Sequence, residues 1–412
     1  MSFIKGVGVL TVGTAISQGI MLLGVVALSR LYSPEEFGIY AVILATSTLL
    51  GFVSSFRYEV TILLPKQERL SEIALSLSLL ISITLNLLAV AVVTGLVLSD
   101  SVGVRWLVVP FVSFSLSIIN IGSFLQNRNS EYVRIVGIQI ARSFIFVAVA
   151  VFFEGQDVLT NGLIVGLVAS VAVPSMYLLA GDFRKGRAYH SVLKLKKLAY
   201  WARKHSKFVY YSTPAVLVGN LASQAPVFLL TALLGTASAG YYAMIQRVMM
   251  APVALVSGAV NKVYLRTVAS RKADQKPIYE YTRSIVRKFS LPGLALATIM
   301  FIAFHFKVLE QLFGDRWNDV DVLAMVMIPA FCISFVAKSI SGFAVLGRNE
   351  LGLIYQIILL SLVSLAIFLT YYFSSSNLSV FLGISAALSL CYSGQSLAIL
   401  RVSRKADEHV LG

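Results

Sequence analysis

Five ionisable side chains lie inside long apolar stretches, where a charge is costly and by default marks a functional pathway. They are Arg57, Glu59, Arg142, Arg247 and Lys338. Four cations against one acid favour an anionic ligand, and the planar fork of arginine can bind two phosphate oxygens. Extension to the lipid headgroups is an alternative for Arg57 and Lys338. The set indicates a row of cations that serves an anionic substrate, with Arg247 farthest from both headgroup layers.

Uncharged amides in the same stretches could hydrogen-bond sugars. They are Gln18, Asn120, Asn220, Gln224 and Gln246. Hydrogen bonding between helices explains such amides equally well. Because Glu59 is only two residues from Arg57, the two should project to different sides of one helix, and we expect Glu59 to pair with a cation on another helix.

No pattern for catalysis or cofactor binding is visible. The sequence has no G-x-x-x-x-G-K-[ST], dinucleotide or G-x-S-x-G motif. The four histidines lack metal-ligand spacing, and Cys332 and Cys391 lie in apolar runs. The longest outer loop, from about Lys307 to Asp321, is too short for an external catalytic domain. We therefore expect no enzyme, no catalytic residue, no cofactor and no metal.

The elements that must position these residues are membrane helices. Hydrophobic residues make up 58% of the 412 residues and charged residues 13%, far below the quarter that is typical of soluble domains. A spanning helix needs about 20 apolar residues. Uncharged stretches of this kind, divided at Gly235–Ser238 and Ser374–Asn377, predict twelve transmembrane helices in an all-α membrane protein, six in each half.

Charge fixes the predicted orientation. With the N-terminus inside, 26 of the 34 lysines and arginines fall in cytoplasmic segments, so the positive-inside rule places both termini in the cytoplasm. The net charge of +15 then follows from topology and does not indicate a nucleic-acid partner.

The longest polar segment, residues 182–207, carries nine of these basic residues. Apolar side chains recur at helical spacing within it, at Val192, Leu195, Leu198, Ala199 and Ala202. This pattern predicts an amphipathic helix on the anionic inner leaflet. The segment divides the chain into an N-terminal six-helix lobe, residues 1–181, and a C-terminal six-helix lobe, residues 208–412.

The two halves show short matches. Phe37-Gly38-Ile39-Tyr40 opens the second span and Ala239-Gly240-Tyr241-Tyr242 opens the eighth. The first and seventh spans carry helix breakers, which are Gly13, Gly19, Gly24, Pro214, Gly219 and Pro226. Interrupted helices at matching positions point to a substrate cavity between halves; close helix packing through small residues is the alternative. Ser33-Pro34-Glu35-Glu36 is typical of a capping box that starts the second span.

Three stretches resemble signatures of polysaccharide-biosynthesis flippases. They are the first-loop stretch from Ser29 to Tyr40, the R-Y-E-x-A-I-x-L-P pattern from Arg57 to Pro65 and the eighth-span stretch from Ala239 to Pro252. Thr61 stands where the second pattern usually has alanine. The resemblance implies the Wzx-type branch of the multidrug/oligosaccharidyl-lipid/polysaccharide exporter superfamily.

The resemblance also implies two pseudo-symmetric six-helix lobes around a central cavity. Such proteins carry undecaprenyl-diphosphate-linked oligosaccharides across the bacterial inner membrane, for O-antigen, capsule or exopolysaccharide. Arg57, Glu59 and Arg247 match motif positions, with Glu59 a candidate for ion coupling. Implied partners are the lipid-linked substrate, membrane lipids, a polysaccharide polymerase and a chain-length regulator. A drug/cation antiporter of the same fold, or a membrane polymerase or ligase, is the alternative.

Overall fold

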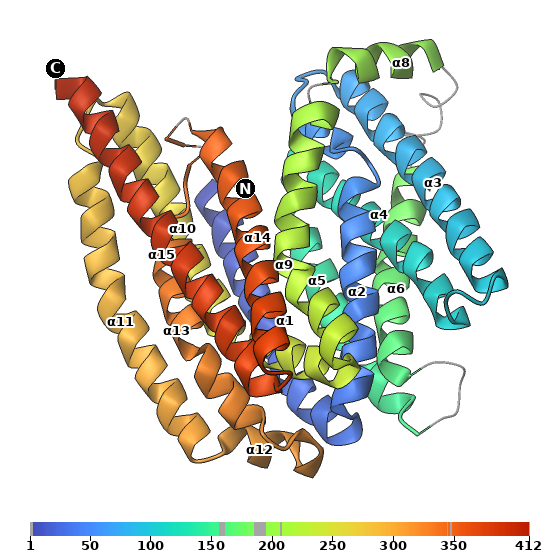
Figure 1. Cartoon of the computed structure of the whole chain (residues 1–412). Coiled ribbons are helices and arrows are strands. Elements are labelled where there is room, and N and C mark those ends of the chain that lie inside the picture. The colour runs from blue at the N-terminus through green and yellow to red at the C-terminus, as the bar shows by residue number, and fades with distance from the viewer. Residues whose placement is uncertain are drawn as a thin grey trace. The chain divides into compact units, whose positions relative to one another are not determined.

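The computed structural model describes residues 3–155, 161–184, 195–206, 208–343, 345–346 and 348–411. Within these ranges the chain forms helices and no strand (Figure 1). Twelve helices are long and apolar enough to cross a membrane, which confirms the predicted class and number of spans.

The spanning helices, in chain order, are α1 (Phe3–Leu31), α2 (Pro34–Val53), α3 (Glu68–Leu98), α4 (Val108–Arg128), α5 (Tyr132–Phe152), α6 (Gly162–Arg184), α9 (Thr213–Leu234), α10 (Thr236–Ala273), α11 (Tyr279–His305), α13 (Val320–Ser339), α14 (Asn349–Phe373) and α15 (Asn377–Leu411). The shorter helices are η1 (Tyr58–Leu63), η2 (Val104–Leu107), α8 (Leu195–Lys204), η3 (Phe208–Ser212), α12 (Val308–Phe313) and η4 (Asp315–Trp317).

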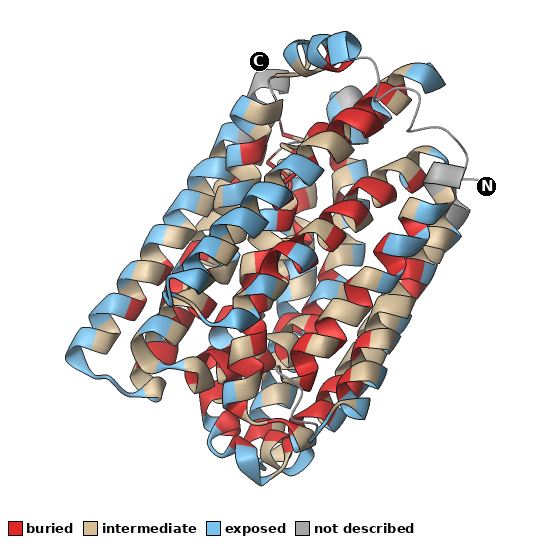
Figure 2. Cartoon of the chain, turned by 90° about the vertical axis from the view of Figure 1, so that its right-hand side faces the viewer, coloured by how far each residue is buried: buried red, intermediate tan, exposed pale blue. Residues whose placement is uncertain are grey.

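Large apolar side chains are exposed along several of the spanning helices. Leu88 on α3, Leu291 on α11 and Phe368 on α14 are each more than half exposed. Exposed and buried residues alternate along individual helices (Figure 2). A water-soluble protein rarely exposes so much apolar surface, so these faces are suited to lipid.

The chain divides into two compact units. The first contains Met1–Tyr32 and Ile39–Asn220, and the second contains Ser33–Gly38 and Leu221–Gly412. In the first unit α5 packs against α1 and α6, and α4 packs against α3. In the second unit α13 packs against α10, α11 and α15. Helices α2 and α9 therefore contribute to both units, while the lobe limits drawn from the sequence stay a prediction.

The capping box at the start of α2 is confirmed. The backbone N–H of Ser33 donates to Glu36 Oε2 at 2.8 Å, and the N–H of Glu36 donates to Ser33 Oγ at 3.4 Å. These reciprocal bonds satisfy two otherwise unpaired donors of the first turn. The next residue, Phe37, packs edge-on against the buried ring of Trp317, with the ring centroids 5.3 Å apart.

Two glycines from the matched stretches face each other in the second unit. A Cβ added to Gly38 would overlap the carbonyl oxygen of Thr236, and one added to Gly240 would overlap that of Pro34. Thr236 lies four residues before Gly240, and Pro34 lies four residues before Gly38. The first turns of α2 and α10 therefore cross reciprocally, backbone against backbone, and this geometry supports the internal repeat.

The expected interruption of the first span is wrong, because α1 is one continuous helix. A Cβ on Gly13 would overlap Val136, and one on Gly24 would overlap Val147, both on α5. These glycines allow α1 to pack closely on α5, which is the alternative that the sequence left open. On α9, Pro226 lies inside a continuous helix.

Candidate substrate site

The sequence suggested that Arg57 and Glu59 belong to the second span. In the structure they lie beyond its end. Helix α2 ends at Val53, and the chain turns before the 3-10 helix η1. Phe56 (φ 48°) and Arg57 (φ 62°) both adopt the left-handed conformation, which is rare for residues other than glycine. This turn places Arg57 at the N-cap of η1.

Arg57 and Glu59 form an ion pair with each other. Arg57 Nη1 lies 3.0 Å from Glu59 Oε1, and the Glu59 side chain is fully buried. Glu59 also accepts hydrogen bonds from Asn120 Nδ2 at 3.3 Å and from Ser55 Oγ. The prediction that Glu59 pairs with a cation on another helix is therefore wrong. The reason is the left-handed turn, which brings together two side chains that a regular helix would separate.

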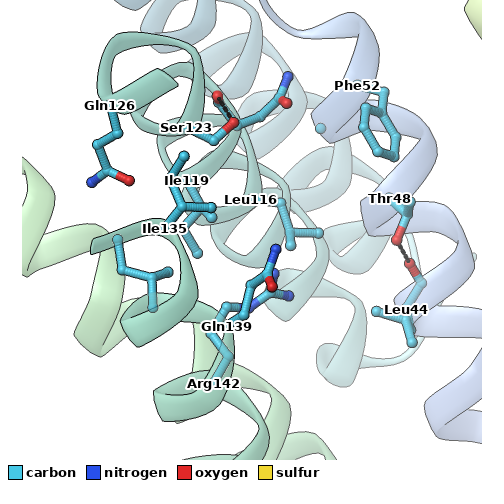
Figure 3. A pocket seen from close by; sticks show the side chains of 13 residues that line it. Leu44, Thr48, Phe52, Leu116, Ile119, Ser123, Gln126, Ile135, Gln139 and Arg142 are labelled. Carbon is cyan, nitrogen blue, oxygen red and sulfur yellow. Dashed lines mark hydrogen bonds between the residues drawn. The ribbon is translucent and has the colours of Figure 1, made fainter. Parts of the chain in front are cut away.

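A pocket of about 330 Å³ lies beside this network, within the first unit. Its size falls at the lower end of the range for small-ligand sites. Helices α2, α4 and α5 form its walls (Figure 3). The lining residues are Leu44, Thr48, Gly51, Phe52, Leu116, Ile119, Asn120, Ser123, Gln126, Ile135, Ile138, Gln139 and Arg142. Asn120 joins the pocket to the network, because it lines the pocket and donates to Glu59.

Arg142 supplies the charge of this pocket. Its side chain lies next to that of Gln139 (Figure 3), and Ile119 and Leu116 also line the pocket. None of the described residues forms an ion pair with it, its Nε is buried without a hydrogen-bond partner, and no acidic residue lines the pocket. A guanidinium in such surroundings binds an anion favourably, since the anion would replace the lost solvation.

Two amides of the pocket, Gln126 and Gln139, were not predicted from the sequence. Gln126 is 2% exposed, and neither its Nε2 nor its Oε1 has a hydrogen-bond partner. An unsatisfied buried polar group typically costs about 1–3 kcal/mol, so a ligand that bonds to it gains affinity. Gln139 lies three residues before Arg142, and this spacing on one helix face could have identified it.

Lys338 and Arg247 belong to the second unit. Lys338 Nζ lies 3.0 Å from Met250 Sδ and 5.8 Å from the centroid of the Tyr392 ring. Arg247 is half-buried on α10. The predicted row of four cations stays a prediction, whereas Arg57 and Arg142 do occur together in the first unit.

The remaining predicted amides are spread over several helices. Gln18 is half-buried on α1 and does not line the pocket. Asn220 Nδ2 on α9 donates to the carbonyl of Val216 at 2.8 Å, within its own helix. Gln224 on α9 and Gln246 on α10 are half-buried in the second unit. Of the amides proposed from sequence, Asn120 is the one that contributes to the pocket.

Part of the predicted amphipathic helix is present as α8. Leu198 and Trp201 are buried against η1 and α3, so part of its apolar side packs on the protein, while its place on the inner leaflet stays a prediction. Leu195 is exposed, and Val192 lies outside the described residues. Burial and the neighbouring Lys204 lower the pKa of His205, whose ring packs at a tilt of 44° against Trp201 with centroids 4.4 Å apart.

Among the described residues, no group of three or more His, Cys, Asp or Glu side chains is placed to hold a metal ion. The candidate site comprises the Arg57–Glu59 ion pair, Arg142 without an ion-pair partner and several neutral hydrogen-bonding groups. Such a set can bind an anion flanked by hydroxyl groups.

The fold is that of transporters of the MOP superfamily. The lipid II flippase MurJ in an inward closed conformation aligns with a TM-score of 0.74 at 11% identity, over 98% of this chain and 90% of that chain. An inward-facing multidrug resistance MATE family transporter aligns with a TM-score of 0.67 at 15% identity, over 94% and 95%.

A MOP superfamily transporter from Pyrococcus furiosus, described as having a binding pocket of reverse polarity, aligns with a TM-score of 0.62 at 15% identity, over 99% and 96%. A family model described as polysaccharide biosynthesis protein matches residues 27–322. The chain belongs to this polysaccharide biosynthesis protein family. No curated protein matches the sequence.

Proposed function

We propose that this protein is a flippase that moves undecaprenyl-diphosphate-linked oligosaccharide repeat units from the inner to the outer leaflet of the bacterial inner membrane, for surface polysaccharide. The observation that carries the proposal is the pocket of the first unit. It contains Arg142 without an ion-pair partner, among neutral amides and hydroxyls and without an acid. A sugar linked to a phosphate offers the complementary groups, an anion and adjacent hydroxyls.

The roles of individual residues follow from their surroundings. Arg142 would bind an anionic oxygen, while Gln126, Gln139 and Asn120 would hydrogen-bond sugar hydroxyls. Arg57 and Glu59 neutralise each other, and we propose that the pair orders the rim of the pocket. For Glu59 to couple transport to an ion, this ion pair would have to open. Arg247 and Lys338, in the second unit, remain proposed substrate-binding cations.

A drug/cation antiporter is the second candidate, because multidrug transporters share the fold. A binding pocket for organic cations requires an acid to face the ligand. Glu59 is the buried acid beside this pocket, and it already has three donors. The charge of the pocket therefore favours the flippase.

Transport assays can separate the two candidates. Vesicles reconstituted with the protein should move a fluorescent polyprenyl-diphosphate oligosaccharide between leaflets, and deletion of the gene should cause lipid-linked repeat units to accumulate on the cytoplasmic leaflet. Empty vesicles and a polyprenyl monophosphate without sugar serve as controls. Extrusion of ethidium without any movement of the oligosaccharide would establish the antiporter instead.

The orientation gives a second test. We expect Ser375, exposed between α14 and α15, to face the periplasm, and Lys276, exposed between α10 and α11, to face the cytoplasm. In a variant with Cys332 and Cys391 replaced by alanine, a membrane-impermeant maleimide should label Ser375→Cys in intact spheroplasts. It should label Lys276→Cys only after the membrane is permeabilised. The opposite pattern would reverse the proposed topology.

A further inference from the structure

Helix α8 is attached to η1 at two points. Trp201 Nε1 donates to Thr61 Oγ1 at 3.1 Å, and the hydroxyl of Tyr58 donates to the carbonyl of Ala202 at 3.0 Å. Leu198 and Trp201 share one buried apolar cluster with Tyr58 and with residues of α3, and α8 lies beside α3 (Figure 1). Because burial raises the pKa of Tyr58, its hydroxyl remains a donor. Helix α8 is thereby joined to the segment that carries Arg57 and Glu59.

The backbone at the start of η1 needs such support. Two consecutive residues, Phe56 and Arg57, are left-handed, and conformations of this kind persist only where neighbouring structure holds them in place. The far end of η1 is held by Arg128 on α4, whose Nη1 donates to the carbonyl of Ile62 at 2.9 Å. Helix α8 supplies contacts at Tyr58, the first residue of η1, and at Thr61, next to Ile62. Ser55 and Asn120 hold Glu59 near the turn.

The hydroxyl of Thr61 is the hydrogen-bond acceptor for the indole N–H of Trp201. The same hydroxyl donates to the carbonyl of Tyr58 at 2.7 Å, and Thr61 is fully buried. Alanine, which the related motif usually has at this position, could not accept the tryptophan N–H. The N–H would then be buried without a partner, which is unfavourable. The threonine is therefore the counterpart of a tryptophan on α8.

We infer that Trp201 and Thr61 are positioning residues, through which α8 fixes the left-handed turn at Arg57 and so the Arg57–Glu59 pair beside the pocket. Displacement of α8 would loosen this turn. Helix α8 would then control the rim of the pocket without touching the substrate. The effect on transport rests on the proposed function, whereas the effect on η1 does not.

A double-mutant cycle tests the inference. Trp201→Phe keeps an aromatic six-membered ring and removes the five-membered ring that carries the N–H, and Thr61→Ala removes the acceptor. In each single variant, hydrogen–deuterium exchange of residues 56–64 should be faster, and the apparent KM for the lipid-linked oligosaccharide should rise roughly three- to tenfold, as expected for one lost hydrogen bond. The double variant should be no worse than either single variant, because both remove the same bond.

Two controls complete the design. Thr61→Ser keeps the hydroxyl and should behave as the wild type, and Trp106→Phe, on η2 outside this network, should change neither measurement. Unchanged exchange of residues 56–64 in both single variants, or strictly additive effects, would overturn the inference. If exchange of residues 56–64 changes non-additively but the apparent KM does not change, α8 does position η1. The Arg57–Glu59 pair would then have no role in the proposed transport.

Discussion

Replacement of Arg142 by alanine is expected to lower transport per inserted molecule about ten- to a hundredfold, since a hydrogen bond to a charged group contributes about 1.5–3 kcal/mol. Lysine should restore part of the activity, because it keeps the charge and loses the planar fork. Glutamate should abolish transport by repelling the anion. The measurement is surface glycan normalised to membrane-inserted protein.

Arg142→Met separates a role in binding from a role in folding. A half-buried guanidinium whose Nε is buried without a hydrogen-bond partner is unfavourable for the empty protein, so an apolar side chain of similar length should raise the melting temperature. Transport should nevertheless fall as far as in Arg142→Ala. A lower melting temperature together with normal transport per molecule would show that Arg142 supports the fold and does not bind substrate.

Arg134→Ala is the matched control on the same helix. Arg134 pairs with Glu131 at 3.2 Å and lies over the ring of Tyr177, and it does not line the pocket. An ion pair this close to the surface contributes little to stability. Transport per molecule in this variant should therefore remain near that of the wild type.

Gly240→Ala is expected to destabilise the protein by about 1–3 kcal/mol or more, the usual cost of overpacking. Its new methyl group would meet the backbone of Pro34, which cannot change rotamer to make room. Gly258, on the same helix, has open space around its Cβ position. Gly258→Ala should instead stabilise α10 by up to about 1 kcal/mol, because alanine favours the helix.

The comparison can be made by thermal unfolding in detergent, followed by the loss of the monomeric chromatography peak. Gly38→Ala should resemble Gly240→Ala, and the double variant should lose less than the sum, because the first substitution already separates the two helix turns. Equal effects of the alanines at positions 240 and 258 would show that the turns do not cross closely.

Several features of the fold were readable from the sequence because they depend on local composition. The cost of burying unpaired backbone groups in lipid restricts spans to apolar stretches of sufficient length, so the twelve helices could be counted directly. The capping box at Ser33 involves residues three apart, and its bonds form as the pattern predicts. The motifs also sufficed to indicate the family.

The site depended on information that no local pattern contains. Pairing of Arg57 with Glu59 requires a left-handed turn that contacts from α3, α4 and α8 maintain, so helical spacing gave the wrong partner. Gln126 became a candidate only when three helices enclosed it without a hydrogen-bond partner.

Gly13 and Gly24, which resembled helix breakers, proved to be contact points for α5. A sequence by itself determines which segments enter the membrane, because transfer from water depends on each segment's own composition. The tertiary structure decides which polar groups meet, because long-range packing fixes the backbone angles and the neighbours of each side chain.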